Sequence, residues 1–190
     1  MTMIIKGLPE RTIVPELQAQ TAIETERFTL RAARNSDQGL LALYAGDKRV
    51  ANATRSIPHP LPPGATEAFI KRANDPARTS QTWVLDGAAQ GLSEVLGVIS
   101  LKPLDREQCE VSFWVAPSFW GTGLARTAVK AVVDANPLKS KTIFASIFQD
   151  NQASARVVTF AGFQYLGDAE AFCVSRGATV KTWTYLCKTA

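Results

Sequence analysis

The chain has 190 residues, a hydrophobic fraction of 46% and a charged fraction of 20%, values typical of one soluble globular domain with a sizeable core. Its net charge of +4 comes from basic residues scattered along the sequence, which argues against a nucleic-acid-binding face. With one histidine, the sequence excludes a multi-histidine metal site and gives no support to a Ser-His-Asp triad.

The first half of the chain is predicted to alternate helices and strands. Residues 1–22 have no clear hydrophobic period and are expected to be a surface-packed extension ahead of one domain at 23–190. The predicted elements are a strand at 27–31, a helix capped by Asn35-Ser36-Asp37 that ends near Asp47, a helix at 66–72, and antiparallel strands at 82–85 and 95–101. Residues 56–64 contain four prolines, which predict a stiff loop.

The second half contains a predicted strand–helix–strand unit. Its elements are a strand at 109–115, a helix at 121–136, a strand at 141–148, a helix at 151–161, and a closing hairpin of strands 171–174 and 182–187. Gly162 suits the end of the second helix and Gly177 the hairpin turn. Strand 109–115, helix 121–136 and strand 141–148 are expected to form a βαβ unit with parallel strands.

The junction between strand 109–115 and helix 121–136 has the features of an anion site. Gly121-Thr122-Gly123 allows a tight turn that aims backbone amides at one point, and the helix adds its positive dipole end. No Asp or Glu occurs from Val111 to Val133, whereas Arg126 and Lys130 do. The pattern predicts a diphosphate cradle, although an ordinary tight turn with a solvated basic helix face fits the same residues.

The order and spacing of these residues resemble the GNAT superfamily of acyl-CoA-dependent N-acyltransferases, and within it the branch that acetylates ribosomal-protein N-termini (RimJ/RimL type). The resemblance begins at Glu24–Arg31, continues through Glu110–Ala125, and ends in Asn151-Gln-Ala-Ser154 with Gly162-Phe163. It implies an α/β (α+β) fold with a mixed, mostly antiparallel sheet flanked by helices. That sheet is splayed between two parallel central strands.

The resemblance also implies how acetyl-CoA, the co-substrate, is bound. Backbone amides would hold its pyrophosphate at Trp120, Gly121, Thr122, Gly123, Leu124 and Ala125. Main-chain groups of Trp114 and Val115 would pair with the pantetheine arm like an added strand. Asn151 and Ser154 would contact the pantetheine or the thiol, and Arg126 would meet phosphate charge. Ser118 departs from the Gln or Arg common at its position, which puts one phosphate-loop contact in doubt.

Acetyl transfer needs a base for the attacking amine and a proton for the leaving thiolate. The resemblance implies Glu110 as the base. The tyrosine that many relatives use as general acid would fall at Val158, so Ser154 or an ordered water must protonate the thiolate. Each residue also has a structural interpretation: Glu110 as a salt-bridge partner, Asn151 as a helix N-cap, and Ser154 as a solvated surface residue.

The sequence therefore predicts an N-acetyltransferase that moves an acetyl group from acetyl-CoA to a primary amine, a protein N-terminal α-amine, by direct transfer in a ternary complex. No activated nucleophile for a covalent intermediate is evident. A small amine (an amino acid, polyamine or antibiotic) is an alternative acceptor. A non-catalytic acyl-CoA-binding module is the rival from another class. The stiff loop at 56–64 is expected to shape the acceptor site, with His59 as a surface residue.

The remaining sequence features predict a cytoplasmic protein. No apolar run approaches membrane-spanning length, and the N-terminus lacks a basic-then-apolar secretory pattern. Cys109, Cys173 and Cys187 have no metal-type spacing, which favours reduced thiols. We expect a monomer or homodimer with no metal, no nucleic acid and no membrane partner.

Overall fold

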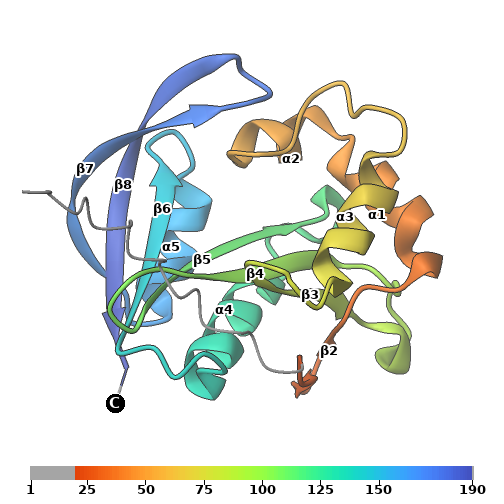
Figure 1. The fold of residues 1–190 in the computed structure, drawn as a ribbon, viewed down its shortest axis with the longest axis horizontal. Coiled ribbons are helices and arrows are strands. Elements are labelled where there is room, and N and C mark those ends of the chain that lie inside the picture. The colour runs from red at the N-terminus through yellow and green to blue at the C-terminus, as the bar shows by residue number, and fades with distance from the viewer. Residues whose placement is uncertain (1–19, 190) are drawn as a thin grey trace, which may run out of the picture.

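A computed structural model describes residues 20–189, which form one eight-stranded sheet flanked by helices (Figure 1). The strand order is β1-β2-β3-β4-β5-β6-β8-β7. The strands are β1 Ile23–Glu24, β2 Thr29–Arg31, β3 Gln81–Asp86, β4 Gly97–Pro103, β5 Gln108–Val115, β6 Thr142–Phe148, β7 Gln164–Cys173 and β8 Ala178–Lys188. The expectation for residues 1–19 lies outside the described residues.

All neighbouring strands are antiparallel except β5 and β6, which are parallel and joined through helix α4 (Leu124–Ala135). Their pairing runs only from Gln108↔Thr142 to Val111↔Ala145. Beyond that point β5 stays paired with β4, and β6 stays paired with β8. The two strands therefore separate toward their C-terminal ends. The predicted βαβ unit and the mixed, mostly antiparallel sheet with a splayed parallel pair are confirmed.

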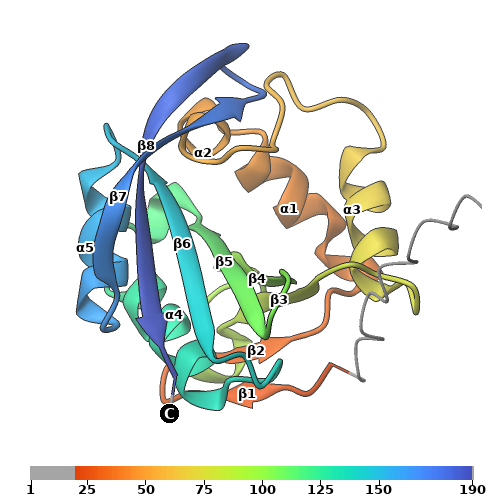
Figure 2. The same ribbon diagram turned by 60° about the vertical axis from the view of Figure 1, so that its left-hand side comes forward.

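The helices cover both faces of the sheet. Figure 2 shows α4 and α5 (Gln152–Phe160) on one side, and α1 (Gln38–Ala45), α2 (Lys48–Ala53) and α3 (Ala65–Asn74) on the other. Because side chains of a strand alternate between faces, Trp83 packs in the core cluster beneath α4 and α5, while Val84 packs in the cluster beneath α1 and α3. No helix in the described part of the chain is long and apolar enough to cross a membrane.

Helix α2 is an element that the sequence interpretation missed. The helix expected to end near Asp47 is α1. It follows a 3₁₀ turn at Asn35–Asp37 and ends at Ala45. Asp47 does not simply close that helix, because its carboxylate accepts a 2.8 Å hydrogen bond from the Arg49 amide and caps a new helix. The chain therefore turns into α2, whose end leads to the stiff loop at 56–64.

The closing hairpin is longer than predicted. Its strands cover 164–173 and 178–188, with Gly177 at φ 60° in the turn, as expected. Strand β7 forms the sheet edge and exposes most of its side chains, so it lacks the alternating pattern by which strands are recognised. The tip docks against α2: the Arg176 Nη2 donates to the Asn52 carbonyl at 2.6 Å, and the Val174 amide donates to the Arg55 carbonyl at 3.0 Å.

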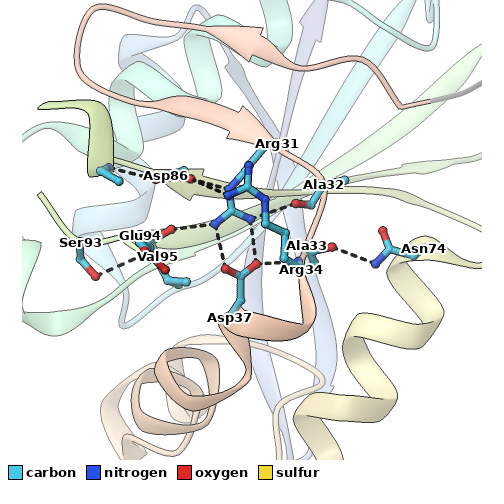
Figure 3. A network of polar contacts seen from close by, with 11 residues as sticks. Arg31, Ala32, Ala33, Arg34, Asp37, Asn74, Asp86, Ser93, Glu94 and Val95 are labelled. Atoms are coloured by element: carbon cyan, nitrogen blue, oxygen red, sulfur yellow. Dashed lines mark hydrogen bonds and ion pairs between the residues drawn. The ribbon is translucent and has the colours of Figure 1, made fainter.

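A buried ion-pair network ties β2 to β3, to the 3₁₀ turn before α1 and to the loop before β4 (Figure 3). The Arg31 guanidinium donates two 2.8 Å hydrogen bonds to Asp37, which has no exposed surface, and pairs with Asp86 through Nε. It also donates to the carbonyls of Ala32 and Glu94. Burial acts to lower the pKa of Arg31, but the hydrogen bonds to Asp37 and Asp86 outweigh it and raise that pKa above its ordinary value.

We predict that Arg31→Ala lowers the free energy of unfolding by about 3–5 kcal/mol, since it leaves the Asp37 carboxylate buried without its cation. Arg34→Ala is the matched control. Its side chain is 62% exposed and 3.7 Å from Asp86, so its loss costs about 1 kcal/mol or less. Urea unfolding of both variants measures the difference. A loss below about 1 kcal/mol for Arg31→Ala contradicts the assignment of this network as a main tie of the fold.

Candidate functional site

A cavity of about 680 Å³ lies where β5 runs into the start of α4. A volume of this size is typical of small-molecule sites. The lining includes ten of the residues predicted to bind the cofactor: Trp114, Val115, Trp120, Gly121, Gly123, Leu124, Ala125, Arg126, Asn151 and Ser154. Residues that are distant in sequence, on β5, α4 and α5, thus meet around one space.

The glycine junction has the backbone conformation that an anion cradle needs. Gly121 and Gly123 adopt φ of 77° and 85°, in the left-handed region where a side chain is strained. Gly123 is the N-cap of α4, and no side chain in the described part of the chain caps this end. The first amides of the helix are therefore free of intrahelical partners and face outward with the positive end of the dipole.

Thr122 is the predicted cofactor residue that does not line the cavity. Its hydroxyl donates to the Phe119 carbonyl at 2.6 Å, and its own carbonyl accepts a 2.5 Å hydrogen bond from Arg27 Nη1. These two hydrogen bonds stabilise the Gly121–Gly123 turn. Val115 is also engaged, because its carbonyl accepts a 2.7 Å hydrogen bond from the Trp120 indole.

The cavity lining is strongly cationic. Asp150 is its one acidic lining residue, whereas four arginines line it: Arg49, Arg126, Arg156 and Arg176. Two of these are stacked on exposed aromatic rings, Arg126 at 4.3 Å from the Phe160 centroid and Arg49 at 5.4 Å from that of Trp120. Arg49 pairs with Asp47 and Arg176 with Asp150, so within residues 20–189 Arg126 and Arg156 are the lining arginines without an ion pair, and they favour an anionic ligand.

Asn151 and Ser154 lie at the start of α5. The Asn151 side-chain oxygen accepts a 3.1 Å hydrogen bond from the Ser154 amide, so the N-cap interpretation is correct. Both residues also line a second cavity of about 620 Å³. The two cavities share Ala53, Phe113, Trp114, Asn151 and Ser154. They therefore meet beside the opening between β5 and β6.

Glu110 lines the second cavity and not the first. Its side chain is 16% exposed, and its Oε1 forms a 2.7 Å ion pair with Arg55 Nη2. The salt-bridge interpretation is thus correct, and it leaves Oε2 outside this ion pair. Sequence reasoning missed Arg55, which follows α2. Val158 is fully buried in the core, and His59 lies on the surface with its Nδ1 3.1 Å from the Gly46 carbonyl.

Gly97 allows the backbone of β5 to approach β4 closely beside both cavities. A Cβ at this position would lie 2.3 Å from the Trp114 carbonyl oxygen and 2.9 Å from the Val115 Cα. Both contacts are to backbone atoms, which cannot rotate away as a side-chain end can. The sequence analysis did not single out this glycine, because the partner strand is identified only by the fold.

Residues 27–164 match the family model described as "Acetyltransferase (GNAT) domain". The GNAT resemblance seen in the sequence is therefore confirmed. No curated protein sequence matches the chain. Among the described residues, no group of three or more side chains is arranged to hold a metal ion.

Solved structures share the fold at low sequence identity. The microcin C7 self-immunity acetyltransferase MccE, in complex with acetyl-CoA and AMP, has a TM-score of 0.74 and 14% identity, over 86% of this chain and 93% of that one. The ribosomal-protein-S5-alanine acetyltransferase from Vibrio fischeri has a TM-score of 0.70 and 20% identity, over 90% and 97%. The spermidine N-acetyltransferase from Vibrio cholerae, with CoA and spermine, has a TM-score of 0.68 and 18% identity, over 85% and 96%.

We predict that Gly97→Ala lowers the free energy of unfolding by about 1–3 kcal/mol, because β4 and β5 must move apart to admit the methyl group. Gly39→Ala in α1 is the control: nothing lies within 4 Å of its Cβ position, and alanine favours helix, so stability rises by up to about 1 kcal/mol. Chemical denaturation of the two variants tests this. Equal stabilities would show that the close approach of the strands is unimportant.

Proposed function

The chain belongs to the GNAT acetyltransferase family and is thus an acyltransferase, and we propose that it transfers the acetyl group of acetyl-CoA to the α-amine of a protein N-terminus by direct attack in a ternary complex. The observation that carries this proposal is the meeting of two cavities at the opening between β5 and β6. The first cavity suits an anionic donor, and the second gives an acceptor amine a separate route to the residues that the two cavities share.

The first cavity supports acetyl-CoA as the donor. The uncapped N-terminus of α4 offers amides to the pyrophosphate, and the arginines around it offer charge to the phosphates. The pantetheine arm would extend along β5, where pairing with β6 has ended; of the backbone groups there, the Val115 carbonyl already accepts from the Trp120 indole. The thioester would then lie near Phe113 and Ser154, which border both cavities.

The second cavity supports attack by a neutral amine. As the amine nitrogen bonds to the thioester carbon, the carbon–sulfur bond breaks and CoA leaves as a thiolate. Glu110 takes the proton released by the amine, through water, on the oxygen that Arg55 does not bind. Ser154 lines both cavities, and its hydroxyl or an ordered water protonates the departing thiolate.

A protein α-amine is the acceptor that the sequence resemblance to the ribosomal-protein branch favours. The presence of a ribosomal-protein-S5-alanine acetyltransferase among the structures of the same fold is compatible with it. A spermidine acetyltransferase also shares the fold, so a small amine is the alternative acceptor. A non-catalytic acyl-CoA-binding module would bind CoA without acetylating any amine.

We predict that CoA raises the melting temperature, and that Arg126→Gln weakens its binding by roughly tenfold through loss of one charge-assisted contact. Lys130→Gln is the control on the same helix. Lys130 pairs with Asp134 at 2.8 Å and does not line the cavity, so its loss leaves CoA affinity unchanged. A melt series over CoA concentration gives both affinities. Equal affinities for the two variants would contradict the donor site.

We predict that Glu110→Gln lowers kcat for peptide acetylation by about 100-fold, because the amide cannot take up the proton. Ser154→Ala lowers it by a smaller factor, while both variants keep the CoA-induced shift in melting temperature. Glu107→Gln, at a surface ion pair with Lys141, is the matched control. Free thiol release measures turnover.

Two results would contradict the proposal. If Glu110→Gln and Ser154→Ala both retain turnover within about threefold of the unchanged protein, the catalytic assignment is wrong. If no peptide or small amine is acetylated although CoA raises the melting temperature, the chain is the non-catalytic binding module instead.

A further inference from the structure

The charges of the second cavity restrict which amine can enter it. Four ionisable side chains line it: Arg55, Arg72, Lys102 and Glu110. Building on the proposed function, we propose that the acceptor is a peptide with a carboxylate side chain within its first few residues, bound by Arg72 and Lys102. These two residues would then determine specificity, whereas Glu110 acts on the amine itself.

The lining carries three cations and one anion. Glu110 is the single carboxylate, and it already pairs with Arg55 at 2.7 Å. A polyamine would place further ammonium groups beside Arg72 and Lys102 with no lining carboxylate left to neutralise them. Like charges in a partly enclosed site repel, so the cavity selects against polycations and in favour of an anionic acceptor.

Arg72 and Lys102 are available for such a ligand. Neither has an ion-pair partner among residues 20–189. Arg72 lies in the last turn of α3, and Lys102 lies on β4 directly opposite Glu110 of β5. Cross-strand partners project to the same face, so Lys102 and Glu110 belong to the same wall of the cavity.

The spacing suits a side chain a few residues along an extended peptide. Lys102 lies at the level of Glu110, three residues before Phe113 on β5, which corresponds to roughly 10 Å along the strand. An amine at the shared border near Phe113 would therefore reach Glu110 only through water, and its second to fourth residues would lie beside Lys102. The hydroxyl-bearing residues Thr82 and Ser100 line the same cavity, and their side-chain oxygens are 2.9 Å apart.

The test compares two peptides that differ only in Asp-Asp or Asn-Asn at positions 2 and 3, together with spermidine. We expect kcat/KM for the acidic peptide to exceed that for the amide peptide by roughly tenfold or more, with the ratio falling as salt is added. Arg72→Gln should lower the ratio several-fold, with Lys102 retaining part of the preference. Lys71→Gln removes the same charge from the neighbouring residue, which lines a different cavity, and should leave the ratio unchanged.

Charge reversal gives an independent readout. The double variant Arg72→Glu, Lys102→Glu should invert the ranking, so that spermidine exceeds the acidic peptide, while the CoA-induced shift in melting temperature shows that it is folded. Equal rates for the two peptides, or a preference of the unchanged protein for spermidine over the acidic peptide, would overturn the inference. Acetylation of both peptides at equal rates leaves the proposed function standing. Absence of any acetylation refutes both.

Discussion

The site depends on one constraint, the early end of the pairing between β5 and β6. The two parallel strands share a ladder only as far as Val111 and Ala145, and each then remains paired with its antiparallel neighbour alone. Buried backbone groups need partners, so an interrupted ladder inside a sheet is costly unless a side chain, water or ligand completes it. The opening thus lies where the two cavities share their lining residues, and it leaves one edge of β5 without a partner strand beyond Val111.

Other contacts keep this opening in place from both sides. On the β5 side, Gly97 lets β4 and β5 approach closely, and the Arg31 network ties β2 and β3 to the loop before β4 and to the turn before α1. On the β6 side, the hairpin of β7 and β8 extends past the sheet and docks on α2 through Arg176, which also pairs with Asp150 at 2.6 Å. The two halves of the sheet are therefore each stabilised by their own contacts, independently of the missing ladder.

Features with a local sequence signal were predictable. The βαβ unit, the glycine junction and the Asn151 cap each follow from residues within one turn or one strand. What escaped prediction depends on partners far apart in sequence. Arg49 and Arg176 reach the donor cavity from α2 and from the hairpin tip, and Arg55 meets Glu110 across 55 positions. No spacing rule connects such residues, because only the completed fold brings them together.

The segment from Asn52 to Arg55 connects the two cavities, because it contributes lining residues to both of them. Its first carbonyl accepts from Arg176, which lines the first cavity, and its last residue pairs with Glu110, which lines the second. The same segment is anchored to the hairpin through the Val174 amide. A common wall of this kind links the two cavities, because the segment that pairs with Glu110 through Arg55 also accepts the hydrogen bonds of Arg176. Helix α2, a short helix with a weak sequence signal, therefore forms part of the wall of both cavities.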